Sequence, residues 1–271
     1  MKVAAIQMVS GTQRDDNLRA ARSLLEQAAH SGAELAVLPE YFCMMGHKDT
    51  DKLAWCEPEG DGVIQRFLAD AARSLQIWIV GGTLPMQTTA PDRVRNTTLV
   101  FDPAGTCVAR YDKIHLFCFD NGQESYQEGR VIEAGHLPVQ FDVEARDGHR
   151  WRVGLSVCYD LRFPELYRAH ARAGSDLLLV PSAFTHTTGE AHWEVLLRAR
   201  AVENLAYVLA PAQGGVHENG RQTWGHSMLV DPWGDIVNAL AQGPGVVLGE
   251  LDAGRVRQVR AQLPALEHRV L

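Results

Sequence analysis

Residues 150–184 read RWRVGLSVCYDLRFPELYRAHARAGSDLLLVPSAF and place a strand, a turn, a helix and a second strand in succession. The first segment, 150–157, and the last, 176–184, are short apolar runs typical of buried strands. Between them, 163–174 has the apolar spacing of a helix. Such a unit predicts neighbouring strands in an α/β sheet, with Cys158 at the carboxyl end of the first strand.

The same alternation of strands and helices continues along the chain. Further strands are predicted at 2–8, 35–40, 77–83, 206–212 and 246–252, and further helices at 14–31, 61–75 (with Asp61 as its cap), 190–204 and 254–263. Two hairpins, 97–113 and 226–240, add antiparallel pairs, whereas 114–136 has no regular pattern. The mixture favours a layered α/β sandwich over a purely parallel sheet. No low-complexity stretch divides the chain, so we expect one domain over 1–271.

Composition excludes several classes of protein. The chain has 271 residues, of which 46% are hydrophobic, and its formal net charge is −7. This length is enough to bury a large core without disulfides, and the negative charge argues against a nucleic-acid partner. No apolar run reaches the roughly 18–20 residues that a membrane helix needs, so no membrane partner is expected.

The cysteines bear on the compartment. There are five, with no C-x-x-C pair, so a disulfide framework is not expected and a reducing, cytoplasmic location is favoured. The N-terminal segment becomes polar too early for a secretory signal. We expect Cys43, Cys107 and Cys118 to pack in the interior and Cys56 to lie near the surface.

Reactive side chains follow several predicted strands, where ligands of α/β sheets bind. Glu40 ends the strand 35–40, Lys113 ends the first hairpin, and Glu128 lies in the irregular segment that follows. Cys158 stands on a strand-to-helix turn, which can lift a nucleophile above a sheet, and a helix N-terminus would favour its thiolate. The alternative interpretation is structural: a buried packing cysteine, a surface glutamate and a solvated lysine.

Four segments carry a family resemblance. They are LAVLPE (35–40), YDKIHLF (111–117), GLSVCYDLRFPEL (154–166) and HWEVLLRARAVEN (192–204). Together, and in this order, they resemble the nitrilase superfamily of carbon–nitrogen hydrolases over essentially the whole chain. The resemblance implies a four-layer α-β-β-α sandwich with mixed sheets, a Glu–Lys–Cys triad, and catalysis without a metal or other cofactor.

The resemblance assigns a role to each reactive residue. Glu40 is the expected general base, Lys113 the stabiliser of the oxyanion, and Cys158 the nucleophile that forms a thioester. The backbone N–H of Tyr159 is expected to join Lys113 at the oxyanion. A second glutamate is common in the family. Glu128, seven residues before Gly135, fits that position better than Glu124, which precedes a serine but has the wrong distance to Gly135. Cys118 departs from the aspartate that many relatives have there.

PSAF (181–184) and GHSMLVDPWG (225–234) are most similar to a branch of small amidases. That branch hydrolyses deaminated glutathione to 2-oxoglutarate and cysteinylglycine, which is metabolite repair. ω-Amidases, which hydrolyse 2-oxoglutaramate, share the same motifs. Enzymes that hydrolyse nitriles or N-carbamoyl groups use the same triad. A non-catalytic binding protein on this fold is the alternative of a different class.

A keto-acid amide carries carboxylate groups, so cationic side chains near Cys158 are candidates to bind it. Arg162 is the best placed in sequence, although pairing with Glu165 is an alternative. Tyr159 belongs to the same turn. Tyr41, Phe184 and Thr185 follow strand ends and are expected to line the pocket, with core packing as the alternative for Phe184.

Two further expectations concern metals and assembly. His115 and Cys118 have H-x-x-C spacing, but His186 and His192 lack the spacing of a second ligand pair, so no zinc is expected. The family resemblance implies a homodimer or a larger even-numbered oligomer. The predicted helices 163–174 and 190–204 carry enough apolar surface for such contacts.

Overall fold

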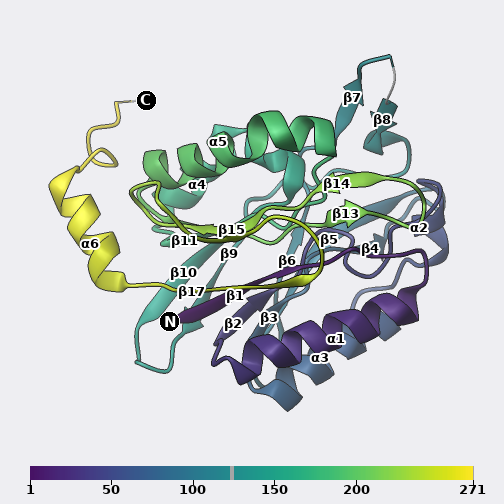
Figure 1. Ribbon diagram of the computed structural model, residues 1–271, viewed down its shortest axis with the longest axis horizontal. Coiled ribbons are helices and arrows are strands. Elements are labelled where there is room, and N and C mark those ends of the chain that lie inside the picture. Colours follow the sequence, from purple (N-terminus) through teal and green to yellow (C-terminus); the bar gives the residue numbers. More distant parts are fainter. Residues whose placement is uncertain (123–124, 271) are drawn as a thin grey trace.

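The computed structural model describes residues 1–122 and 125–270. Two β-sheets lie face to face, with α4 (Pro164–Arg172) and α5 (His186–Asn204) over one outer face and α1 (Arg14–His30) and α3 (Val63–Leu75) over the other (Figure 1). The expected four-layer α-β-β-α sandwich with mixed sheets is therefore confirmed.

The first sheet has seven strands in the order β17-β1-β2-β3-β5-β4, with β6 paired to β5. Their bounds are β1 (Lys2–Gln7), β2 (Leu35–Val37), β3 (Trp78–Val80), β4 (Leu84–Gln87), β5 (Val94–Phe101), β6 (Cys107–Asp112) and β17 (Gly245–Glu250). β1, β2 and β3 are parallel, whereas β17, β5, β4 and β6 join in antiparallel fashion. The predicted hairpin over 97–113 is therefore present as β5 and β6.

The second sheet has six strands in the order β16-β15-β12-β11-β10-β9. Their bounds are β9 (Gln140–Glu144), β10 (Arg150–Leu155), β11 (Leu177–Leu179), β12 (Tyr207–Ala210), β15 (Ser227–Val230) and β16 (Ile236–Leu240). β10, β11 and β12 are parallel, as the strand–helix–strand unit in 150–184 predicts. β15 and β16 form the predicted second hairpin.

Two small hairpins were not predicted. β7 (Cys118–Asp120) pairs with β8 (Ser125–Gln127), within the segment 114–136 that was expected to be irregular. β13 (Gly214–Val216) pairs with β14 (Gln222–Trp224) between two strands of the second sheet. Both hairpins lie at the same end of the sheets (Figure 1).

The N-termini of two helices, α5 and α3, differ from the prediction. α5 begins at His186 rather than at residue 190, because the Thr185 side chain caps it by accepting from the N–H of Thr188. Asp61 is not the cap of α3, so that prediction is wrong. The carboxylate of Glu57 accepts the N–H of Ile64 at 2.6 Å instead and satisfies the start of that helix.

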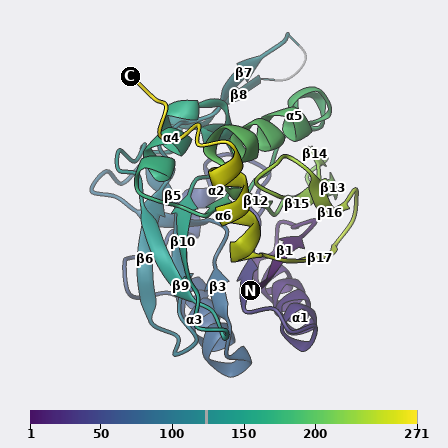
Figure 2. The same cartoon turned by 90° about the vertical axis from the view of Figure 1, so that its left-hand side faces the viewer.

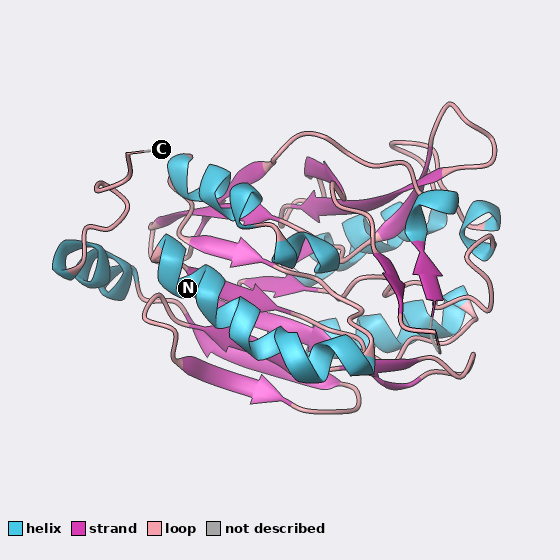
Figure 3. Cartoon of the chain, turned by 90° about the horizontal axis from the view of Figure 1, so that it is seen from above, coloured by secondary structure: helices cyan, strands magenta, loops and turns pink. Residues whose placement is uncertain are grey.

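The remaining helices are short or peripheral. They are α2 (Asp51–Ala54), α6 (Ala253–Gln262) and the 3₁₀ turns η1 (Glu128–Arg130) and η2 (Cys158–Arg162). α6 packs at one end of the sheets, apart from the helices that cover their faces (Figures 2 and 3). Within the described part of the chain, no helix is long and apolar enough to cross a membrane.

Side chains point alternately to the two faces of each strand and so contribute to two hydrophobic cores. In β1, Val3 and Ala5 face the second sheet and join the core between the sheets, whereas Ala4 and Ile6 face α1 and α3. This period of two is the geometry of an extended strand with both faces covered. The sheets are consequently fixed to each other and to their helices, which gives the strand ends a rigid setting.

Candidate active site

Each predicted catalytic residue lies just beyond the end of a strand. Glu40 follows β2 and Lys113 follows β6 in the first sheet, whereas Cys158 follows β10 in the second sheet. Glu128 opens η1, which follows the β7–β8 hairpin. The packing of one sheet on the other therefore brings together residues that are distant in sequence.

Lys113 lies between two carboxylates. Its ammonium Nζ donates to Glu40 Oε1 at 2.9 Å and to Glu128 Oε2 at 2.8 Å. The side chain is fully buried. Burial by itself would lower the pKa of Lys113, but the negative charges of Glu128 and Glu40 outweigh it, so the pKa is raised. Lys113 is consequently a fixed positive charge at neutral pH.

Glu40 is buried, and its carboxylate accepts hydrogen bonds from three donors. Its Oε1 accepts the Asn96 side-chain amide at 2.9 Å as well as Lys113, and its Oε2 accepts the backbone N–H of Ala183 at 2.9 Å. Ala183 follows β11 of the second sheet, so Glu40 also connects the two sheets. These bonds fix the orientation of its carboxylate.

Glu128 takes the position expected of the second glutamate. Its Oε2 accepts the backbone N–H of Phe117 at 2.8 Å in addition to Lys113, and its Oε1 accepts the Tyr41 hydroxyl at 2.7 Å. Burial acts to raise the pKa of Glu128, but Lys113 and these donors lower it overall. The rival candidate, Glu124, lies outside the described residues.

Cys158 is in a left-handed backbone conformation, with φ of +49°. A non-glycine residue rarely adopts it, and such strain is typical of functional turns. Burial raises the pKa of the Cys158 thiol, and the charge of Glu40 adds to that effect while Lys113 opposes it; the result lies well above the usual value. Cys158 opens the 3₁₀ turn η2, and α4 begins only at Pro164, so the favourable effect of a helix N-terminus on the thiolate stays a prediction.

The two backbone N–H groups at the cysteine turn differ in whether they are free to bind a ligand. The N–H of Cys158 donates to the carbonyl oxygen of Pro181 at 3.0 Å and is therefore occupied. The N–H of Tyr159 has no acceptor among the residues that the structure describes. Tyr159 can therefore offer its N–H to a ligand held at the Cys158 sulfur.

Asp160 fastens the cysteine turn to the lysine segment. Its Oδ2 accepts the N–H of Val157 at 2.9 Å and the Tyr111 hydroxyl at 2.6 Å. Its Oδ1 accepts the N–H of His115 at 3.0 Å, and the Nδ1 of that ring lies 2.7 Å away. Asp160 is fully buried, so this carboxylate links the segments on either side of Lys113 and Cys158.

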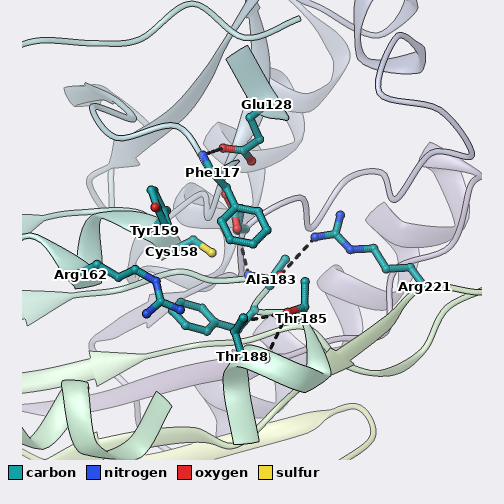
Figure 4. A pocket seen from close by; sticks show the side chains of 11 residues that line it. Phe117, Glu128, Cys158, Tyr159, Arg162, Ala183, Thr185, Thr188 and Arg221 are labelled. Atoms are coloured by element: carbon teal, nitrogen blue, oxygen red, sulfur yellow. Dashed lines mark hydrogen bonds between the residues drawn. The ribbon is translucent and has the colours of Figure 1, made fainter. Parts of the chain in front are cut away.

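The pocket beside Cys158 contains most of the predicted substrate residues. Its lining residues are Glu40, Phe117, Glu128, Cys158, Tyr159, Arg162, Ala183, Phe184, Thr185, Thr188 and Arg221 (Figure 4). Its free volume is about 10 Å³, which is room for about one water.

Arg162 lines this pocket, as expected of a substrate-binding residue, and is not paired with Glu165 in the part of the chain that the structure describes. Its guanidinium lies 5.6 Å from the centre of the Phe184 ring and 5.8 Å from that of Tyr159. Its nitrogen atoms lie 3.3 Å from His192 Nδ1, and no ion pair with Glu165 is present among the described residues. Phe184 combines both interpretations, because it lines the pocket and packs 4.9 Å from the ring of Trp193.

Tyr41 lies beside the pocket and not in its lining. It belongs to a neighbouring cavity, where its ring contacts the ammonium of Lys52. Arg221 lines both spaces and was missed from the sequence. The signal that could have found it is Asn219-Gly220, a dipeptide typical of hairpin turns, immediately before it.

The histidines and the cysteine considered as zinc ligands lie apart and make other contacts. His115 stacks on Phe163 with ring centres 3.7 Å apart, and His186 and His192 both lie on α5. Cys118 is exposed on β7, as Cys107 is on β6, so the prediction that these two cysteines pack inside is wrong. Over residues 1–122 and 125–270, no group of three His, Cys, Asp or Glu side chains could hold a metal ion.

Cys43 is buried, as predicted, within the segment that follows β2. Its thiol lies 3.7 Å from the carbonyl oxygen of Thr83. Cys56 is partly exposed, which agrees with the expectation of a near-surface position.

Comparison with known proteins gives the family. The carbon-nitrogen hydrolase family model matches residues 2–261. Deaminated glutathione amidase of Synechocystis is 40% identical over 270 residues, which cover 98% of this chain and 97% of that protein. Nit3 of Saccharomyces cerevisiae, a member of the nitrilase superfamily, superposes with a TM-score of 0.88 at 29% identity, covering 100% of this chain and 97% of that one.

The NitFhit protein of C. elegans superposes with a TM-score of 0.89 at 36% identity, covering 99% of this chain. This chain spans 65% of that longer protein. These matches agree with the motifs and with the four-layer fold. The chain therefore belongs to the carbon–nitrogen hydrolase family and is an amidase of the nitrilase superfamily.

Proposed function

We propose that this amidase hydrolyses deaminated glutathione to 2-oxoglutarate and cysteinylglycine through a thioester on Cys158. The observation that carries the catalytic assignment is the position of Lys113 Nζ, 2.9 Å from Glu40 and 2.8 Å from Glu128, beside the strained cysteine turn. The substrate assignment is supported by relatives named deaminated glutathione amidase, for example the Synechocystis protein at 40% identity and the human protein at 38%.

The first half of the reaction forms the thioester. Because the pKa of Cys158 is raised, its thiol needs a base, and Glu40 accepts the proton as sulfur attacks the amide carbon. The carbonyl oxygen gains the electron pair and is stabilised by the Lys113 ammonium and the Tyr159 N–H. When the C–N bond breaks, the proton on Glu40 passes to the leaving nitrogen.

The second half consumes one water. Glu40 removes a proton from that water, whose oxygen attacks the thioester carbon. The C–S bond then breaks, the keto acid leaves, and the proton returns to the Cys158 sulfur. Glu128 takes no proton in this cycle; its lowered pKa keeps it ionised, and it holds the Lys113 ammonium in place.

Arg162 is proposed to bind a carboxylate of the keto-acid half. Its guanidinium faces the pocket between two aromatic rings, and no carboxylate lies within ion-pair distance of it among the described residues. A planar guanidinium can hold a carboxylate by two parallel hydrogen bonds. Phe184 and Thr185 then line the acyl side, and Tyr41 supports Glu128 through its hydroxyl.

The test is product analysis with purified protein on deaminated glutathione, 2-oxoglutaramate and a simple nitrile in parallel. Rapid release of 2-oxoglutarate from deaminated glutathione is expected, and Cys158→Ala should abolish it. A preference for 2-oxoglutaramate would reassign the substrate to that of an ω-amidase. Near-wild-type turnover by Cys158→Ala would refute the thioester mechanism.

Assembly and location follow as parts of the same proposal. We propose a single carbon–nitrogen hydrolase domain that forms a homodimer or larger oligomer through α4 and α5. Val195 and Val202 on α5 are 62% and 46% exposed and support an interface there. Five free cysteines are typical of a reducing compartment, which supports a cytoplasmic location.

A further inference from the structure

Arg221 is a half-buried cation whose donors are mostly unused. Its Nε is buried without a hydrogen-bond partner. One terminal nitrogen reaches the carbonyl oxygen of Ala183 only at 3.5 Å, and the other reaches the sulfur of Met45 at 3.9 Å. A guanidinium has five N–H donors, and buried polar groups are normally satisfied. No carboxylate lies within ion-pair distance of it in the described part of the chain.

The backbone holds Arg221 firmly in this position. It lies in the turn of the β13–β14 hairpin, where its N–H donates to Asn219 Oδ1 at 2.9 Å and its carbonyl oxygen accepts the N–H of His217 at 2.8 Å. His217 is itself buried, with ring nitrogens 2.9 Å from the carbonyl oxygen of Ser10 and 2.7 Å from Thr223 Oγ1. The guanidinium is therefore presented to the pocket by an anchored turn.

Arg162 and Arg221 occupy different sides of the catalytic pocket. Figure 4 shows Arg162 near Cys158 and Arg221 across the pocket from it, beyond Phe117 and Ala183. The Ala183 carbonyl oxygen faces Arg221 while the Ala183 N–H holds Glu40. Arg221 thus lies on the side of the general base, which must protonate the departing nitrogen.

A larger cavity begins at Arg221. It has a volume of about 520 Å³, and Arg221 lines both this cavity and the catalytic pocket. Other charged or titratable side chains in its wall are His47, Lys48, Asp49, Lys52, Tyr41 and Tyr126. The Arg221 guanidinium lies 5.1 Å from the centre of the Tyr126 ring. Asp49 is paired with Lys52 at 3.3 Å, so cations predominate in the wall. The volume is enough for a dipeptide-sized group, whereas the space beside Cys158 is not.

We propose that Arg221 binds a carboxylate on the leaving-amine half of the substrate, and that the cavity beside it receives that half. The inference rests on the proposed function and adds a specificity-determining residue to it. Arg162 and Arg221 would then hold one carboxylate on each side of the scissile amide. This arrangement selects amides whose leaving amine ends in a carboxylate over amides that release ammonia.

The test is a binding cycle in Cys158→Ala protein, which cannot turn the ligand over. Affinities for deaminated glutathione and for the same molecule with its terminal carboxylate converted to a carboxamide are measured by calorimetry. With Arg221 present, the acid should bind about 10–100-fold more tightly than the carboxamide, the range of a charge-assisted hydrogen-bond pair. Arg221→Gln should reduce that preference to less than about 3-fold.

Arg257→Gln is the matched control, because this exposed arginine lies on α6, away from the pocket, and should leave the preference at its original value. Equal weakening of acid and carboxamide by Arg221→Gln, or no binding of either ligand, would overturn the inference. Failure of the proposed function has a different signature. In that case an Arg221-dependent preference for the acid would persist, while protein with Cys158 intact would release no 2-oxoglutarate.

Discussion

At the scale of single residues, the charge of Glu40 contributes to the raised pKa of the Cys158 thiol. Burial is the largest cause of the raised pKa of Cys158, and Glu40 is the next. We therefore expect Glu40→Gln to lower the pKa of the thiol, because the neutral amide no longer opposes the thiolate while Lys113 still favours it. The same change should reduce turnover by several orders of magnitude, since the proton acceptor is lost.

The measurement is the pH titration of thiolate absorbance, taken as the difference between each protein and its Cys158→Ala counterpart. The titration midpoint should move to lower pH in Glu40→Gln. Glu144→Gln, an exposed change at the end of β9, is the control and should not move it. An unchanged or higher midpoint in Glu40→Gln would contradict the electrostatic argument.

Lys113 also carries a prediction about stability. Lys113→Met leaves Glu40 and Glu128 buried without their cation, which should reduce the free energy of unfolding by about 3–5 kcal/mol at neutral pH. In the wild type the pKa of Glu128 is lowered, so its stabilisation is complete above the unfolded value of about 4.3 and disappears as pH falls through the folded value. The difference between the two proteins should therefore narrow below about pH 4.

Urea denaturation at neutral and acidic pH measures that difference. Lys48→Met removes an exposed lysine and serves as the control, with an expected change within about 0.5 kcal/mol. A loss in Lys113→Met that is independent of pH would show that packing, and not the pair of carboxylates, causes it.

At the scale of elements, Asp160 holds the cysteine turn against the lysine segment. Asp160→Asn keeps one acceptor oxygen but turns an amide toward either Val157 and Tyr111 or His115, where donors already point. We expect a loss of about 2–3 kcal/mol in the free energy of unfolding. Displacement of the turn should also reduce kcat by about 10–100-fold.

Steady-state kinetics and urea denaturation test this positioning role together. KM should change little, because Asp160 does not line the pocket. Asp142→Asn on β9, which weakens ion pairs with Arg150 and Arg152, is the matched control and should leave kcat unaltered. If Asp160 had only a structural role, Asp160→Asn would lower the free energy of unfolding while kcat stayed at the wild-type value.

Elements with a clear period were predictable, and elements fixed by tertiary contacts were not. The apolar strands and the turn that carries Cys158 follow from local pattern, so their ends and the reactive residues on them were found. The cap of α3 was missed because Glu57 reaches Ile64 from outside the helix, beyond a local capping rule. The β13–β14 hairpin is a three-residue pairing supported by buried His217, so Arg221 escaped notice.

At the scale of the whole molecule, two buried histidines connect separate parts of the fold. His170 of α4 places Nε2 2.8 Å from the carbonyl oxygen of Leu155 in β10, and His217 joins the β13–β14 hairpin to Ser10 after β1. Burial lowers the pKa of both rings. Each ring is therefore neutral in the folded protein at a pH where the unfolded chain already binds a proton.

This difference sets the direction of the pH dependence of stability. A lowered folded pKa means that the stabilisation is complete above the unfolded value of about 6.5 and declines as pH falls below it. Each histidine should contribute a slope of up to about 1.4 kcal/mol per pH unit in that window. We expect urea denaturation to show that the free energy of unfolding decreases as the pH is lowered from 7.5 to 5. His170→Gln combined with His217→Gln should flatten this slope, whatever the variant's stability at pH 7.5. His30→Gln, at the exposed end of α1, should retain it. An equally steep decline in the double variant would assign the effect to other groups.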